Sequence, residues 1–169
     1  TIFPSGTAVD KSGADLGDGT LRVLLLGEGN FSFAAALALG WGDAASLTAT
    51  TLASESVTMA LGGDVEDNLE TVKAFGAAVC FKVDATALNA SSSELVLQRG
   101  GKKGYERIVF NFPNAEASTA SHHMAVEANQ ALLRGVFKSV MSNRLLKSSV
   151  GELHLTLRQA DAADWKLVD

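Results

Sequence analysis

The chain has 169 residues, a length typical of one domain. Its 14 Lys and Arg are outnumbered by 19 Asp and Glu, so the formal net charge is −5, and 47% of the residues are hydrophobic. This hydrophobic content excludes a wholly disordered chain. No apolar run reaches the roughly 18 residues of a membrane span, so no membrane partner is expected. A single cysteine, Cys80, excludes an internal disulfide framework and predicts a reducing intracellular compartment.

Strand and helix patterns alternate along the chain after residue 20. Residues 1–20 are rich in Gly, Ser, Thr and Asp, which predicts a flexible N-terminal arm and leaves 21–169 as the folded domain. Because crossover helices cover both faces of a parallel sheet, the alternation predicts an α/β, doubly wound, mostly parallel, Rossmann-like fold. The expected strands are Leu21–Leu26, Ser46–Leu52, Ala77–Val83, Tyr105–Phe112 and Gly151–Leu157, and the expected helices are Asn30–Leu39, Asp64–Phe75, Thr86–Gln98, Met124–Leu146 and Ala160–Val168, with a short segment Ser56–Leu61 after the second strand.

The predicted helix Met124–Leu146 is amphipathic. Apolar residues recur along it at i, i+3 and i+4 spacing, which is typical of one face turned to the core. The residues expected on that face are Leu133, Val136, Phe137, Val140 and Met141.

Two groups of basic residues stand out in an otherwise acidic chain. Taken alone, each group is interpreted as solvated surface, and the net acidity argues against strong non-specific binding of nucleic acid without excluding a local basic patch. The first group is Arg99, Lys102, Lys103 and Arg107, and the second is Arg134, Lys138, Arg144 and Lys147.

A glycine turn follows the first predicted strand. Gly27-Glu28-Gly29 lets the backbone bend sharply and approach a ligand, and the helix after it offers free N–H groups. Ser32 replaces the third glycine of a dinucleotide fingerprint, so an ordinary strand-to-helix turn remains an alternative. A nicotinamide site also needs an acid at the end of the second strand, and the nearest acid, Glu55, comes a few residues late.

Two further strand ends carry polar residues. Asp84 follows the third strand, where its carboxylate has two equally weighted roles: accepting a hydrogen bond from an adenine amino group or capping the next helix. The fourth strand ends in Asn111-Phe112-Pro113, a pattern of amide, aromatic ring and proline that is similar to amino-methyltransferase loops. The alternative is a strand stopped by proline, with Phe112 in the core.

Several short strings taken together resemble one family. They are Gly27–Phe33 (GEGNFSF), Asn68-Leu69, Val83–Leu88 (VDATAL), Phe110–Pro113 (FNFP), and Asn129-Gln130 with Leu132-Leu133. With these strings, the chain resembles the eukaryotic large-subunit ribosomal RNA uridine-N3 methyltransferase-like family from about Leu21 to Val168.

The resemblance implies a class I methyltransferase fold that binds S-adenosylmethionine and methylates N3 of a uridine. It further implies ribosomal RNA or a pre-ribosome as partner, and the nucleolus or nucleus as location, with the cytoplasm as an alternative. The same resemblance implies a role for each segment. The methionine part of the cofactor would lie beside Gly27, Glu28, Gly29, Asn30 and Phe31, and the ribose would lie near Thr50–Ser54, chiefly Thr51 and Ser54. The adenine would meet Asp84 and Ala85, and the target base would face Asn111, Phe112 and Pro113.

The chain departs from the family at three places. Leu25 stands where many class I enzymes have an acid, so Glu28 is expected to meet the cofactor's ammonium group. Asn114 replaces the usual His after the FNFP string. The chain also ends after about five predicted strands, so the C-terminal strands of a class I sheet are expected to be missing. These departures keep open a catalytically inactive binding module, and a nicotinamide-dependent oxidoreductase is a weaker alternative.

The reaction would remove the imide proton from uridine N3, and the sequence offers no obvious general base. Glu116, His122 and His123 follow the Asn111 loop, but the two histidines are interpreted as the polar start of the long helix. Phe112 is the expected stacking platform for the base. No metal is expected, because three His and one Cys lack zinc spacing, and His154 and Cys80 are interpreted as structural. The oligomeric state is left open.

Overall fold

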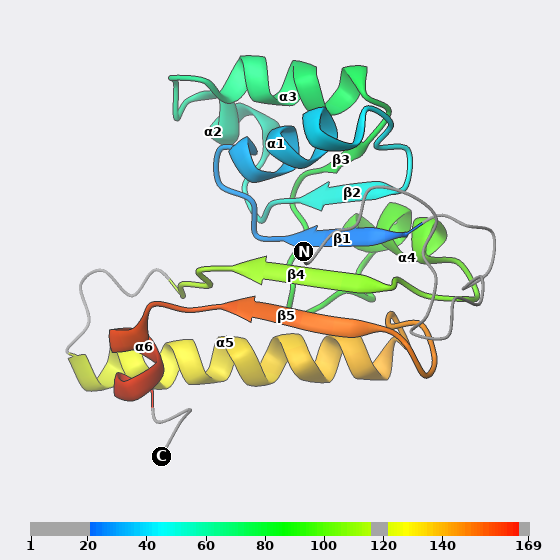
Figure 1. The fold of residues 1–169 in the computed structure, drawn as a ribbon. Helices are drawn as coiled ribbons and strands as arrows, with labels where there is room; N and C mark the ends of the chain where they lie inside the picture. Colours follow the sequence, from blue (N-terminus) through cyan, green and yellow to red (C-terminus); the bar gives the residue numbers. More distant parts are fainter. Residues whose placement is uncertain (1–20, 116–121, 166–169) are drawn as a thin grey trace.

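Five parallel strands form one sheet in the computed structural model, which describes residues 21–115 and 122–165. The strand order is β3-β2-β1-β4-β5 (Figure 1), so the chain changes direction across the sheet beside β1. In such sheets ligands bind at this switch point, beyond the carboxyl ends of the strands. The strands are β1 (Val23–Leu26), β2 (Leu47–Thr50), β3 (Ala78–Cys80), β4 (Arg107–Asn111) and β5 (Glu152–Thr156).

Helices cover both faces of the sheet because the residues of each central strand alternate in direction. Val23 and Leu25 of β1 are buried with the apolar sides of α1 and α3, whereas Leu24 and Leu26 are buried with those of α4 and α5. The predicted α/β, doubly wound, Rossmann-like fold is therefore confirmed. The helices are α1 (Ser32–Trp41), α2 (Glu55–Met59), α3 (Val65–Ala74), the 3₁₀ turn η1 (Ser91–Ser93), α4 (Glu94–Gly100), α5 (His122–Ser142) and α6 (Gln159–Asp164).

The third strand is shorter than the predicted Ala77–Val83. β3 ends at Cys80 because Lys82 takes a left-handed conformation with φ of 59° and the chain turns back toward the end of β2. There the Lys82 N–H donates to the Ala53 carbonyl at 3.0 Å, and the Val83 N–H donates to the Thr51 carbonyl at 2.9 Å. The turn brings the segment after β3 against the loop after β2.

The predicted helix Thr86–Gln98 is wrong over its first half, because consecutive turns occupy 85–90. Asp84 closes the first turn through its side chain, and the Leu88 N–H donates to the Ser139 hydroxyl of α5 at 2.8 Å. These bonds to a side chain and to another helix compete with helix formation. The α-helix starts only at Glu94.

The long helix is present, but its predicted apolar face is only partly buried. Leu133, Val136 and Val140 are buried, whereas Phe137 and Met141 are 47% and 66% exposed. The helix therefore buries a narrower stripe than the spacing predicts. None of the described helices is both long and apolar enough to cross a membrane. The predicted arm at 1–20 and the end of the last predicted helix, 166–168, lie outside the described residues.

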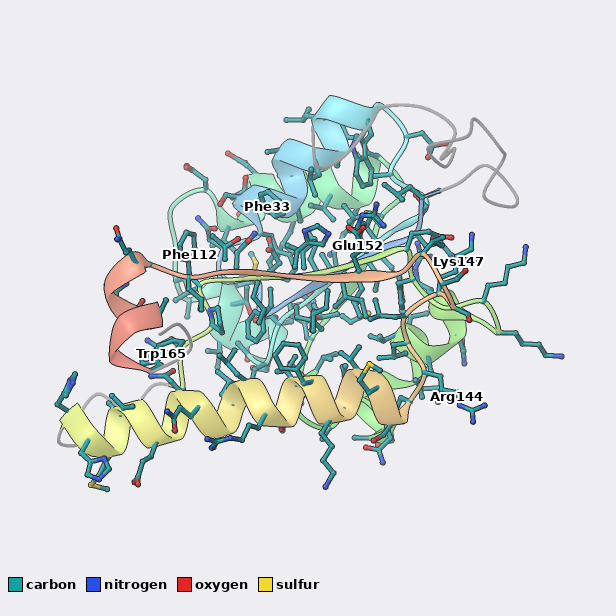
Figure 2. All side chains as sticks on the ribbon, turned by 60° about the horizontal axis from the view of Figure 1, so that its bottom comes forward. Phe33, Phe112, Arg144, Lys147, Glu152 and Trp165 are labelled. Carbon is teal, nitrogen blue, oxygen red and sulfur yellow. The ribbon has the colours of Figure 1, made fainter. Side chains whose placement is uncertain are left out.

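The two ends of the sheet carry different kinds of side chains. Figure 2 shows Phe112 and Trp165 at the end where the strands stop, and Arg144 and Lys147 at the end where they begin. Aromatic and amide groups thus lie at the carboxyl edge, and cationic groups lie at the amino edge.

We expect Gly27→Ala to destabilise the fold by about 2 kcal/mol or more, because a non-glycine residue is strained at positive φ and a clash adds to that strain. Gly27 has φ of 67°, and a Cβ there would lie 2.3 Å from the Phe110 ring. Urea unfolding measures the loss. Gly29→Ala is the matched control, since a Cβ at Gly29 meets no atom within 4 Å. Equal stability of the two variants would contradict this view of the turn.

Candidate functional site

The turn after β1 is held open toward solvent by bonds to its neighbours. The Glu28 N–H donates to the Thr50 carbonyl of β2 at 2.8 Å, and the Asn68 side chain of α3 donates to the Asn30 carbonyl at 3.0 Å. Within the described residues, the Gly29 and Asn30 N–H groups have no hydrogen-bond partner. Two donors and an open glycine surface therefore lie at the switch point, an arrangement suited to an anionic or polar ligand.

Glu28 is the one acid inside this turn. Its side chain folds back over the start of α1, where one carboxylate oxygen, Oε2, accepts the Ala34 N–H at 3.2 Å. The residue is only 8% exposed, and burial raises the pKa of this carboxyl from 4.5 to about 7, against a smaller lowering by the Ala34 hydrogen bond. A cation beside the free oxygen Oε1 would favour ionisation and bring the pKa down again.

The ends of β2 and β3 meet beside the glycine turn. Thr51 is buried and linked through its backbone to both Cys80 and Val83, and the Ser54 hydroxyl caps α2 by accepting the Val57 N–H at 3.3 Å. Asp84 closes a turn with one oxygen, which accepts from the Thr86 N–H at 2.8 Å and the Thr86 hydroxyl at 2.7 Å. Of the two roles predicted for Asp84, capping is therefore observed, although it caps a turn instead of a helix. The second carboxylate oxygen, Oδ2, takes no part in this cap.

The tip after β4 exposes an aromatic ring. Phe112 has φ of 50° and is 60% exposed, so the alternative that placed it in the core is wrong. Its N–H donates to the Thr156 carbonyl of β5 at 2.8 Å, and the Asn111 Oδ1 accepts from the Thr156 hydroxyl at 2.8 Å. These bonds leave the Asn111 NH₂ without a partner in the described part of the chain. Pro113 is buried and anchors the tip.

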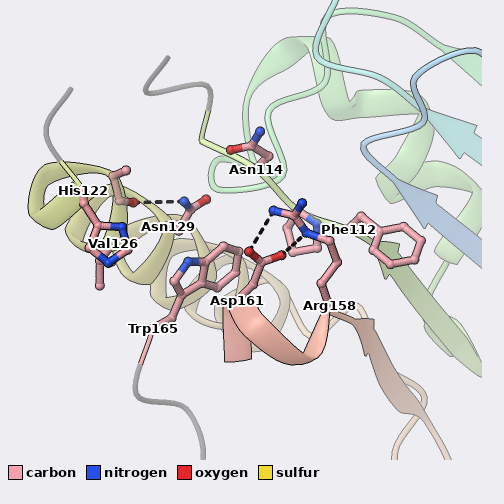
Figure 3. A pocket seen from close by; sticks show the side chains of 10 residues that line it. Phe112, Asn114, His122, Val126, Asn129, Arg158, Asp161 and Trp165 are labelled. Carbon is pink, nitrogen blue, oxygen red and sulfur yellow. Dashed lines mark hydrogen bonds and ion pairs between the residues drawn. The ribbon is translucent and has the colours of Figure 1, made fainter. Parts of the chain in front are cut away.

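A cavity of about 600 Å³ opens behind this tip, between α5 and α6 (Figure 3). Arg158 and Asp161 form an ion pair at 2.6 Å on its rim, and the Arg158 hydrogen bond holds the pKa of the Asp161 carboxyl below its usual range. The Asn129 Oδ1 accepts the Ala115 N–H at 2.9 Å, which ties the end of the tip to α5. The lining residues are Phe112, Pro113, Asn114, His122, Ala125, Val126, Asn129, Arg158, Asp161 and Trp165.

The predicted site residues therefore come together at one edge from four separate segments. Their roles stay predictions, and one contact is restricted: the Phe31 side chain is fully buried and packs edge-to-face on Phe81, so only its backbone faces the turn. His122 and His123 do begin α5, as predicted, and His123 lies 3.8 Å from Glu127. Glu116 lies outside the described residues.

The cavity wall from α6 was not found by sequence reasoning. Asp161 lies in the short helix α6, and Arg158 and Trp165 flank it. No motif marks these residues, and only the fold brings them to Phe112. Asn129 and Gln130 were part of the family resemblance. Gln130 donates to the Trp165 carbonyl at 2.7 Å, so both amides hold the walls of the cavity. Among the described residues, no group of three or more His, Cys, Asp or Glu side chains could hold a metal ion.

The parallel strand order, with a glycine turn at the switch point, defines the class of protein: a Rossmann-like methyltransferase fold. Residues 24–169 match the model of the family described as BMT5-like, rRNA (uridine-N3-)-methyltransferase BTM5-like. The chain belongs to this BMT5-like family, which confirms the resemblance seen in the sequence.

Relatives of the chain have varied lengths. It is similar to an uncharacterized protein of Arabidopsis thaliana, with 35% identity over 150 residues, which cover 86% of this chain and 68% of that protein. It is also similar to heavy metal-associated isoprenylated plant protein 41 of Arabidopsis thaliana (32% identity; 86% of this chain, 27% of that protein). A third relative is the ferredoxin-fold anticodon-binding domain-containing protein 1 homolog of Mus musculus (35% identity; 80% and 20%). No solved structure matches the chain.

We expect the ligand-free protein to lose stability as the pH rises from about 5 to about 8, because Glu28 has a raised pKa in the folded state. The folded chain then binds the proton more tightly than the unfolded chain, so ionisation of Glu28 favours unfolding. The free energy of unfolding of the wild type should fall by about 2–3 kcal/mol across this range because of Glu28, and this fall should be absent in Glu28→Gln. Urea unfolding at both pH values measures it.

The control for this prediction is Glu70→Gln, which changes an exposed carboxyl of α3. Its stability difference from the wild type should be the same at both pH values. If the Glu28→Gln difference is equally constant, Glu28 is not the titrating group.

Proposed function

We propose that this chain is an S-adenosylmethionine-dependent RNA methyltransferase that acts on N3 of a uridine in large-subunit ribosomal RNA. The observation that carries the proposal is that the carboxyl ends of β1, β2, β3 and β4, each followed by polar residues, lie at one edge of the sheet around the switch point. Leu26 pairs with Phe110 in the β1–β4 register, so the glycine turn and the Asn111 tip leave the sheet side by side. Family membership supplies the reaction class.

The residues of the turn fit the cofactor. The open face of Gly29 and the unpaired N–H groups beside it offer room and donors for the methionine carboxylate. Glu28 Oε1 is the acceptor available to the ammonium group, and the unused Oδ2 of Asp84 is available to the adenine amino group. The bound cofactor supplies an electrophilic methyl on a sulfonium, and the protein contributes orientation and electrostatics.

The tip after β4 fits an unpaired pyrimidine ring. Uridine N3 lies on the Watson–Crick edge, so the base must be single-stranded or turned out of a helix. The exposed Phe112 ring offers a stacking surface, and the unpaired NH₂ of Asn111 is placed to donate to a ring carbonyl as N3 loses its proton. The cavity behind the tip has space for the flanking nucleotide.

A second candidate is a module that binds the cofactor but transfers no methyl group. Asn114, which replaces the family's usual His, lines the cavity beside Phe112, and this observation favours the alternative. The nicotinamide alternative has less support, because β2 ends without an acid and Glu55 begins α2 as an exposed side chain 3.9 Å from Lys73. A methyl-transfer assay on ribosomal RNA separates the first two functions.

Calorimetry should show S-adenosylmethionine binding to the chain and no NAD binding. Gly29→Val should weaken this binding at least about tenfold, because the added side chain occupies the open face of the turn, where a Cβ meets no protein atom within 4 Å. Gly40→Val is the matched control, since a Cβ at Gly40 in α1 also meets no atom within 4 Å. Unchanged affinity of Gly29→Val would place the cofactor elsewhere.

Removal of the Phe112 ring should weaken RNA binding by roughly 1–3 kcal/mol, the usual range for one base stacked on one aromatic side chain. Phe112→Ala should leave cofactor affinity and unfolding unchanged, because the ring contributes little to the core. Phe137→Ala, a similarly exposed ring on α5, is the control. Fluorescence anisotropy with a uridine-containing RNA measures the loss, and equal affinities for the two variants would refute the stacking role.

A further inference from the structure

The two basic groups of the sequence meet at the amino edge of the sheet. The first lies at the end of α4, in the turn after it and at the start of β4, and part of the second lies between α5 and β5. The residue just before β1 is basic as well. We call this surface the basic edge, and it consists of Arg22, Arg99, Lys102, Lys103, Arg107, Arg144 and Lys147, half of the chain's 14 Lys and Arg.

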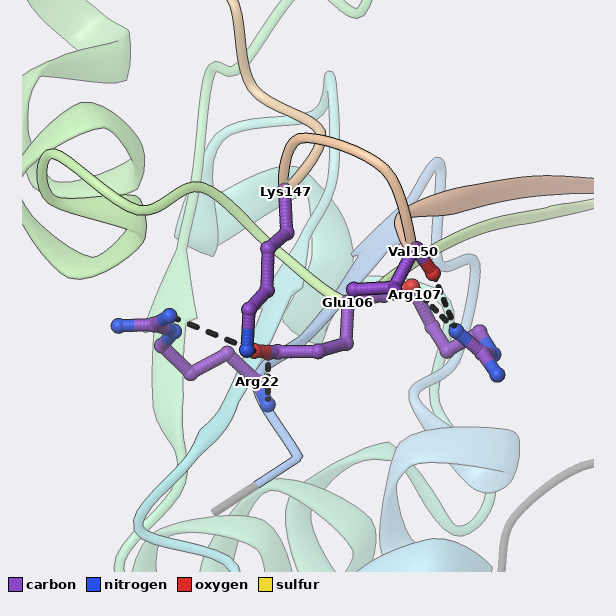
Figure 4. A network of polar contacts seen from close by, with 5 residues as sticks. All are labelled: Arg22, Glu106, Arg107, Lys147 and Val150. Carbon is purple, nitrogen blue, oxygen red and sulfur yellow. Dashed lines mark hydrogen bonds and ion pairs between the residues drawn. The ribbon is translucent and has the colours of Figure 1, made fainter. Parts of the chain in front are cut away.

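The acids of this edge are fewer and largely neutralised. Glu106, 1% exposed, is bracketed by Lys147 at 2.8 Å and Arg22 at 3.4 Å (Figure 4). Glu152 lies 3.3 Å from Arg107, and Asp43 in the α1–β2 loop is the third acid. Among the described residues, seven cations against three anions make this edge positive in a chain whose net charge is −5.

Three cations of the basic edge point into solvent. Lys102 and Lys103 lie in the exposed turn between α4 and β4, and Arg144 lies after α5 with φ of 50°. None of the three forms an ion pair within the described residues. An exposed cation without an acidic partner keeps its full attraction for a polyanion.

A cavity of about 290 Å³ lies in the same edge, lined by Arg22, Ala45, Ser46 and Arg99. Arg99 is held rigidly, because Nε donates to the Thr48 hydroxyl at 2.8 Å and Nη2 donates to the Ala45 and Leu47 carbonyls. The Nη1 groups of both arginines and the Ser46 hydroxyl have no partner within the described residues.

A buried donor of Arg22 also lacks a partner among the described residues. Its Nε is fully enclosed and makes no hydrogen bond to any of them. A buried unpaired donor is rare in proteins and points to a ligand or water that completes it. The guanidinium groups around this cavity therefore suit an anion, since a phosphate accepts several N–H donors at once.

We propose that the basic edge binds the phosphate backbone of the RNA substrate, with one phosphate seated between Arg22 and Arg99. The inference rests on the proposed function, which makes RNA the acceptor, and adds a second contact surface at the opposite edge of the sheet. RNA is favoured over an acidic protein for two reasons. Guanidinium groups around a small polar cavity match a phosphate, and the cations extend along the edge as the phosphates extend along an RNA strand.

The two surfaces are separated by the length of a strand. β4 spans five residues, about 17 Å at about 3.3 Å per residue. An RNA that reaches from Phe112 to the basic edge must therefore exceed about five stacked nucleotides at about 3.4 Å each. Short RNA should touch only the tip, and longer RNA should touch both surfaces.

The test compares two triple variants of the full chain by fluorescence anisotropy over a range of salt concentrations. Lys102→Gln/Lys103→Gln/Arg144→Gln neutralises the basic edge, and Lys73→Gln/Arg134→Gln/Lys138→Gln removes the same charge from exposed positions elsewhere. With a labelled single-stranded RNA of about 30 nucleotides, the first variant should bind at least about tenfold more weakly and show a salt slope lower by about 2. The control should change by less than about twofold, and an RNA of about five nucleotides should not distinguish them.

A further variant tests the cavity itself. Ser46→Asp puts a carboxylate between the two guanidinium groups, so it should keep or raise Tm while lowering affinity for the long RNA about fivefold or more. Ser91→Asp, an exposed serine of η1, is the matched control. Wild-type affinity of Ser46→Asp, at unchanged or raised Tm, would overturn the seated phosphate.

Each remaining outcome also decides the proposal. Equal weakening by both triple variants would show a response to net charge alone and overturn it, as would edge-dependent binding of polyglutamate or anionic vesicles in place of RNA. Calorimetry with S-adenosylmethionine on the same variants should be unchanged. If the wild type does not bind the cofactor, the proposed function is contradicted. If the basic-edge variant binds RNA as tightly as the wild type, only the proposal for this surface is contradicted.

Discussion

The close approach between the turn at Gly27 and the ring of Phe110 determines where the candidate site lies. β1 and β4 are parallel neighbours, and Leu26 pairs with Phe110, so both strands end at the same level. The chain after β1 then turns sharply across the ring, in a space that no side chain can share. Because one strand leads to the glycine turn and the other to the Asn111 tip, this single contact places a donor loop and an acceptor loop next to each other.

The parallel arrangement also separates two kinds of chemistry. All carboxyl ends of the strands meet at one edge, and all amino ends meet at the other, so each loop belongs to one of two surfaces. At the carboxyl edge the structure places Glu28, Asp84, Asn111 and Phe112, where a buried acid, amide and aromatic groups suit a small polar ligand and a base. At the amino edge it places cations around buried Glu106. An acidic protein can thus keep a positive surface.

Three amide side chains from the sequence strings of the family form hydrogen bonds to backbone groups of the chain itself. Asn68 donates to the Asn30 carbonyl, Asn129 accepts from the Ala115 N–H, and Gln130 donates to the Trp165 carbonyl. Each bond satisfies a loop group that secondary structure leaves unpaired, and together they hold the glycine turn and both walls of the cavity. The strings that identify the family are therefore partly the supports of its site.

The sequence by itself determined the fold class, the five strands and the segments that form the candidate site. These rest on local features: apolar runs such as Leu21–Leu26, glycines where the chain must bend, and short strings of the family. Helix boundaries near Asp84 were missed, because a side-chain hydrogen bond to Thr86 and a contact with Ser139 outweigh helical spacing.

Only the tertiary structure decided which distant residues meet. The burial of Glu28, the exposure of Phe112 and Phe137, the α6 wall at Arg158 and Trp165, and the union of two basic groups at one edge depend on contacts between segments far apart in the chain. Local periodicity carries no information about such contacts, since they arise only when the sheet register brings the loops together.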